Sequence, residues 1–170
     1  MSHVDTPWTR LASRTARGVL SRKGVTYEEL LVCLQSVGVD ETLKGIVGKI
    51  QRGGFKCGFF LQLLCALEAD LPPELQHIID HRESWEDACT QIAAHTLAVH
   101  SLTVNQLEKR FSKHGIALSR EHIEQQFSTG AFPFTLLLQL SLIAPIAGLE
   151  RVVDASDIAK AAREAALPMK

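Results

Sequence analysis

The sequence has no excess of charge of either sign and few aromatic residues. Eighteen Lys and Arg stand against 19 Asp and Glu, the formal net charge is -1, and Phe, Trp and Tyr together make up 6%. A protein that coats nucleic acid over its whole surface carries a strong positive excess, which this chain lacks. Any basic surface must therefore be local.

Cysteine is scarce and carries no pattern typical of a metal site. The four cysteines are Cys33, Cys57, Cys65 and Cys89. They form no C-x-x-C pair and no Cys/His zinc spacing. Free cysteine is among the most buried residue types, so we expect core thiols in a reducing compartment, the cytoplasm.

Long hydrophobic runs are missing as well. The most apolar stretch begins at Phe132 and is interrupted by Gln139 and Pro145, which makes it too short for a comfortable membrane span. The N-terminus has no basic segment followed by an apolar core, as a signal peptide would. We therefore expect a soluble cytoplasmic protein with no membrane partner.

The sequence also lacks the residue patterns of a catalytic site. There is no G-x-x-x-x-G-K-[ST] loop for phosphate, and most histidines are scattered without a nucleophile partner. His77 and His81 have the i, i+4 spacing that places two imidazoles on one helix face, but two ligands are too few for a metal site. We predict no enzyme, no metal and no cofactor.

What the sequence does have is a repeat. The stretches GGFKCGFFLQLLCAL, from Gly53, and TGAFPFTLLLQLSLI, from Thr129, both place an apolar run after G-x-F. Shifting the sequence by 77 residues aligns 8–68 with 85–145 without a gap and gives twelve identical pairs. Average composition would give about four. Because Trp, Gly and Phe are among the matched residues, we interpret the chain as a tandem duplication.

Each copy has the periodicity of four helices, and no strand pattern competes. In copy 1 the first helix is expected from about 8 to 21, and Thr26 caps the second helix with Glu29 completing a capping box. Gly38 ends that helix, Asp40 caps the third, and Gly53 ends the third.

Copy 2 repeats most of these signals. Thr103 and Gln106 form the second capping box, Gly115 ends that helix, Ser119 caps the next, and Gly130 ends it. In both copies the apolar fourth helix is expected to be the central core helix of its own unit.

These elements divide the chain into four parts. Residues 8–70 are a basic repeat 1, 71–84 an acidic linker with a short helix, 85–147 a neutral to acidic repeat 2, and 150–168 a C-terminal helix. The fold class is therefore all-α.

Repeat 1 resembles the helix-turn-helix domain of the Cro and λ-repressor type. The second helix opens with Gly24, Thr26, Glu29 and Leu30 in a G-x-T-x-x-E-L pattern. The remaining matches are Ile46 or Val47, Ile50, Arg52 and Gly53 at the end of the third helix, and Leu61, Leu64, Ala66 and Leu67 in the fourth. The order W-x-x-L-A, G-V-T-Y-x-E-L and R-G-x-F is also similar to an uncharacterised bacterial domain family.

The resemblance implies a DNA-binding transcriptional regulator. Two fused copies would act as a single-chain pseudo-dimer, with repeat 1 as the main DNA-contacting half. The candidate DNA-binding residues are Lys44, Lys49, Gln51, Arg52 and Lys56, with Arg22 and Lys23. A secondary basic stripe is formed by Arg10, Arg14 and Arg17 on the first helix. Lysine and arginine contact phosphates, and Gln51 or Arg52 could reach a base edge.

Three features favour a different function for the same fold. The turn before the third helix is several residues longer than in the Cro type, Gly45 and Gly48 remove side chains from that helix, and repeat 2 has Glu121 and Glu124 at the corresponding place. The alternative is a protein–protein interaction module that no longer binds DNA. The sequence leaves association of two chains into a homodimer open.

Overall fold

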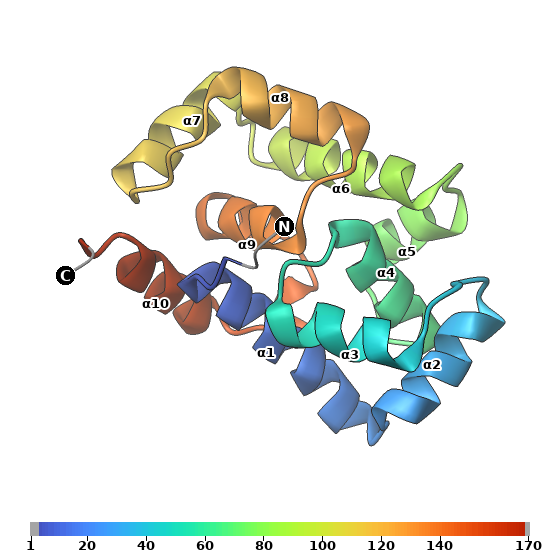
Figure 1. Cartoon of the computed structure of the whole chain (residues 1–170). Helices are drawn as coiled ribbons and strands as arrows, with labels where there is room; N and C mark the ends of the chain where they lie inside the picture. The colour runs from blue at the N-terminus through green and yellow to red at the C-terminus, as the bar shows by residue number, and fades with distance from the viewer. Residues whose placement is uncertain (1–3, 169–170) are drawn as a thin grey trace.

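The computed structural model describes residues 4–168, and it is all-helical (Figure 1). Repeat 1 contains α1 (Pro7–Lys23), α2 (Tyr27–Ser36), α3 (Leu43–Arg52) and α4 (Cys57–Ala66), and α5 (Pro73–Asp80) follows. Repeat 2 contains α6 (Trp85–Val99), α7 (Val104–Lys113), α8 (Arg120–Thr129) and α9 (Phe134–Ile143). The 3-10 turn η1 (Leu149–Arg151) and α10 (Ala155–Ala165) come last. Both bounds of α7, α8 and α9 lie 77 residues after those of α2, α3 and α4.

Most of the predicted helix ends are confirmed by their hydrogen bonds. Thr26 accepts from the backbone N–H of Glu29, but the return bond to the Glu29 side chain is not formed, so the predicted capping box is only half present. Thr103 and Gln106 form the full capping box. Asp40 is wrong as the cap of α3. The cap is Thr42, whose hydroxyl accepts from the N–H of Gly45 at 3.0 Å. A capping side chain bonds to an N–H two or three residues later in the chain, and Asp40 lies too early to reach that of Gly45.

The fourth helices are exchanged between the repeats. α4 packs against α2 of its own repeat and against α6 of repeat 2, whereas α9 packs against α7 of its own repeat and against α1 of repeat 1. In Figure 1, α4 and α9 lie between α1–α3 below and α6–α8 above. Each fourth helix was expected to be the central core helix of its own unit, but it is shared between the two repeats. Buried side chains of both repeats form one continuous hydrophobic core.

The exchange occurs where two extended segments cross. The N–H of Cys57 donates to the carbonyl of Phe132 at 2.9 Å, and the N–H of Phe134 donates to the carbonyl of Phe55 at 3.0 Å. The rings of Phe60 and Phe134 stack next to this crossing with their centroids 4.0 Å apart. The Phe of each G-x-F motif thus lies at the point where the two repeats meet.

The Gly of each G-x-F motif ends a helix and touches the first helix of its own repeat. Gly53 has a φ of 71°, and a Cβ on it would lie 1.8 Å from the carbonyl oxygen of Thr9 in α1. Gly130 has a φ of 70°, and its Cβ would lie 1.9 Å from the carbonyl oxygen of Glu86 in α6. Only glycine satisfies both the left-handed backbone and the close approach.

The helix that follows each fourth helix, α5 or α10, packs against the first helix of the other repeat. α5 packs against α6, and α10 packs against α1 and α9. Pro73 is the first residue of α5, as expected for a proline at a helix start. None of the helices described over residues 4–168 is long and apolar enough to cross a membrane.

Candidate nucleic-acid interface

The exposed face of α3 carries three polar side chains, Lys44, Gln51 and Arg52. Gly48 lies between Lys44 and Gln51 on the same face at helical spacing, and Arg52 adjoins them at the end of the helix. Lys44, Gln51 and Arg52 are exposed, while the opposite face of the helix is buried in the core through two isoleucines, Ile46 and Ile50. Side-chain and backbone caps fix both ends of the helix. The fold therefore presents these three polar side chains to solvent on a rigid element.

Lys49 is held by groups within the protein. Its ammonium forms an ion pair with Glu41 and lies 5.2 Å from the centroid of the Phe59 ring. Sequence reasoning did not identify Glu41 as a partner of this lysine. Glu41 precedes the first turn of α3, so helical spacing does not place it beside Lys49 and the sequence held no signal for the pair. A phosphate would have to compete with Glu41 for Lys49.

The two glycines of α3 leave room for neighbouring side chains. A Cβ at Gly48 would lie 2.7 Å from Nη1 of Arg52, so the guanidinium lies over the helix at that point. A Cβ at Gly45 would lie 2.9 Å from a carboxylate oxygen of Glu41. Both close atoms belong to side chains that can move, and neither glycine has a positive φ.

Three further basic candidates donate to backbone carbonyls. Lys56 reaches Ala131 at 3.0 Å, and its side chain remains exposed next to the crossing of the repeats. The two at the end of α1 reach across to other segments, Arg22 to the carbonyl of Arg151 at 2.6 Å and Lys23 to that of Glu68 at 3.2 Å. These bonds position the cations without neutralising them.

The basic stripe on α1 faces carboxylates in part. Arg10 pairs with Asp5 at 3.0 Å. Arg14 lines a groove of about 230 Å³ between α1 and the C-terminal segment. Arg17 is exposed. The stripe is a less uniform positive surface than its spacing suggested, because the groove also holds three carboxylates, Glu150, Asp154 and Asp157.

Repeat 2 has different residues at the equivalent positions. The residues 77 positions after Lys44, Gln51, Arg52 and Lys56 are Glu121, Ser128, Thr129 and Pro133. Within α8, Arg120 pairs with Glu124 at 3.0 Å, and this hydrogen bond raises the pKa of Arg120. The exposed face of α8 therefore lacks the cations that α3 presents.

All four cysteines lie in the core or pack against it. Cys57 and Cys89 are buried where α4 packs against α6, and a hydrogen bond to Cys89 together with burial raises the pKa of the Cys57 thiol. Burial also raises the pKa of Cys65, which is half-buried. A reactive cysteine needs a lowered pKa. Within residues 4–168 no three His, Cys, Asp or Glu side chains cluster as metal ligands would.

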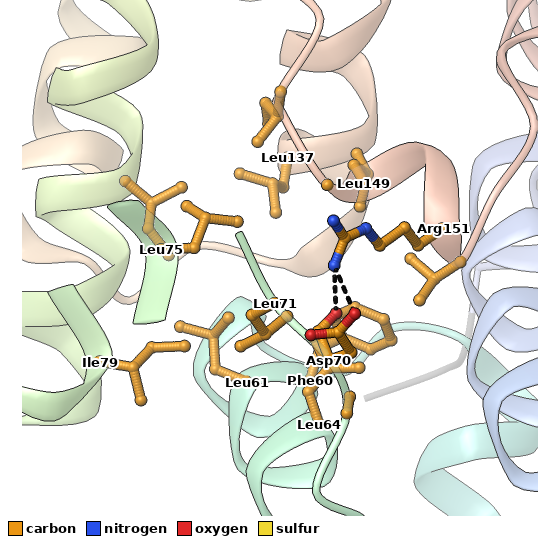
Figure 2. Close-up of a pocket in the computed structure, with 15 residues that line it drawn as sticks. Phe60, Leu61, Leu64, Asp70, Leu71, Leu75, Ile79, Leu137, Leu149 and Arg151 are labelled. Carbon is orange, nitrogen blue, oxygen red and sulfur yellow. Dashed lines mark hydrogen bonds and ion pairs between the residues drawn. The ribbon is translucent and has the colours of Figure 1, made fainter. Parts of the chain in front are cut away.

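An apolar cavity of about 40 Å³ lies where α4 and α9 meet the two segments that follow them. Figure 2 shows Leu61, Leu75 and Leu137 around it, with the ion pair of Asp70 and Arg151, 3.0 Å long, at one side. Clefts that bind small molecules have about 300 Å³ or more. This cavity is therefore a packing gap rather than a ligand site.

No curated protein and no solved structure matches the chain. Residues 8–71, which span repeat 1, match the model of an uncharacterised family described as Domain of unknown function (DUF6471).

Proposed function

We propose that the protein binds duplex DNA through α3 of repeat 1 and acts as a regulator of transcription. The observation that carries the proposal is the exposed set of Lys44, Arg52 and Lys56. None of the three lies within 4 Å of a carboxylate among the residues that the structure describes. Cations without a carboxylate partner are free to neutralise phosphates.

The helix-turn-helix resemblance supports the same surface. In that fold the helix after the turn enters the major groove, and the flanking residues contact the backbone. Here that helix is α3, and Lys56 follows shortly after its end. At Gly48 the atoms nearest to an added Cβ belong to the mobile side chain of Arg52, so a duplex can approach the helix backbone there when that side chain moves.

Binding to random duplex DNA at several salt concentrations tests the proposal. Each phosphate contact contributes about -0.9 to the slope of log K against log salt, so three contacts give about -2.7. The double variant Lys44→Glu, Arg52→Thr gives α3 the residues of α8 and should reduce the slope to about -0.9. A fluorescence anisotropy titration measures both.

A matched control separates a contact from a net-charge effect. Lys109→Glu with Lys113→Thr changes the net charge by the same amount on exposed positions of α7. We expect this control to retain the slope of the unmodified protein. Equal losses in the two variants would refute α3 as the contact surface.

The carboxylates around the starts of α2 and α3 favour a second function, the binding of a protein partner. Glu28 and Glu29 lie in the first turn of α2, and Asp40 and Glu41 precede α3. Carboxylates there would repel the phosphates that approach these ends in a helix-turn-helix complex. Absence of any binding to duplex DNA at low salt would favour this second function.

A further inference from the structure

The end of α3 that would read bases carries few side chains able to do so. In the helix-turn-helix motif the N-terminal residues of the recognition helix contact base edges. Lys44 is the single long polar side chain among the first six residues of α3. The other five are buried, half-buried and apolar, or without a side chain: Leu43, Gly45, Ile46, Val47 and Gly48. Gln51 and Arg52 lie at the opposite end of the helix.

The second repeat has two exposed carboxylates on α8 and presents this helix on another side of the molecule, although Arg120, His122 and Gln125 of α8 are exposed as well. A dimeric helix-turn-helix protein reads two half-sites about one helical turn apart. The counterpart of Lys44 in α8 is Glu121, and Glu124 follows one turn later. α3 and α8 also lie on either side of the α4–α9 pair (Figure 1). Recognition would thus depend mainly on one half of the molecule.

These two observations limit the discrimination between sequences. One good contact to a base pair discriminates by about 5- to 150-fold. Regulators with defined operators bind them about 10³-fold or more tighter than other DNA. One reading side chain on one half is insufficient for that ratio, whereas the cations Lys44, Arg52 and Lys56 suit phosphates of any sequence.

We infer that repeat 1 binds duplex DNA chiefly through phosphates and with little dependence on base sequence. The inference rests on the proposed function and specifies its partner as DNA of any sequence, contacted by one half of the chain. The proposed regulator would then act on DNA of any sequence rather than at one operator.

Selection from a randomised duplex pool, followed by competition binding, tests the inference with the full chain. We expect no enriched motif, and we expect the best selected duplex to bind less than about 150-fold tighter than the unselected pool. Lys44→Ala should weaken binding to all duplexes by a similar factor. A selected motif bound about 10³-fold tighter would overturn the inference but leave the proposed function standing. No binding of any duplex at low salt would overturn both.

Discussion

The contact between Gly53 and α1 allows a stability prediction with a worked magnitude. A methyl group in Gly53→Ala would lie 1.8 Å from the backbone carbonyl oxygen of Thr9, about half the usual contact distance between carbon and oxygen. The position of the methyl group and that of the carbonyl are both fixed by the backbone, so no side-chain rotation relieves the clash. The helices α1 and α3 would have to separate.

Two costs add at this position. A left-handed backbone costs a residue with a Cβ about 1 to 2 kcal/mol, and overpacking costs about 1 to 3 kcal/mol. Gly53→Ala should therefore reduce the free energy of unfolding by about 2 to 5 kcal/mol. For a chain of this length each kcal/mol corresponds to about 2 to 4 °C in Tm.

The adjacent glycine provides the control. Gly54 has no atom within 4 Å of an added Cβ and no positive φ, so Gly54→Ala should be neutral or slightly stabilising. Gly130→Ala should repeat the loss in the other half, because its Cβ would lie 1.9 Å from the carbonyl of Glu86. Chemical denaturation of the three variants measures the differences. A Gly53→Ala protein within about 0.5 kcal/mol of the unmodified protein would refute the described contact.

Three other predictions concern α3, the shared core and the buried thiol of α4. Gly48→Ala should raise the free energy of unfolding by up to about 1 kcal/mol, because only the mobile end of the Arg52 side chain is close. The same variant should weaken DNA binding. Unchanged affinity would show that close approach of α3 to the duplex is not needed. The shared core predicts one cooperative unfolding transition in calorimetry, and two separate transitions would contradict the exchange of α4 and α9. The raised pKa of Cys57 means that the unfolded chain loses this proton first, so stability should fall above about pH 8.5 by at most about 1.4 kcal/mol per pH unit. Cys57→Ala should flatten that slope, and an equal slope in the variant would assign it to other groups.

Local signals in the sequence predicted the helices but not their partners. Thr26, Thr103 and Ser119 act through hydrogen bonds to residues three positions away, so the sequence alone locates the helix starts. Helical periodicity shows which face of α4 is apolar but not which helix covers it. Because the two repeats have similar apolar patterns, the periodicity is satisfied equally well when a fourth helix packs within its own repeat and when it packs against the other repeat.

The sequence also predicted the exposed side chains of the candidate site but not their partners. The exposed positions of Lys44, Gln51 and Arg52 follow from the periodicity of α3. The pairing of Lys49 with Glu41 depends on the course of the chain before the helix, which periodicity does not specify.

Directed cleavage of DNA by the protein tests the role of α3 most directly. An iron chelate would be tethered at Gln51→Cys or, separately, at Ser128→Cys, which is 77 residues later and also exposed, in a chain with Cys33 and Cys65 replaced by Ser. Cys57 and Cys89 are buried and would not be labelled. We predict cleavage of bound duplex from position 51 and little from position 128. Equal cleavage from both positions, or cleavage from position 128 alone, would contradict DNA binding through repeat 1.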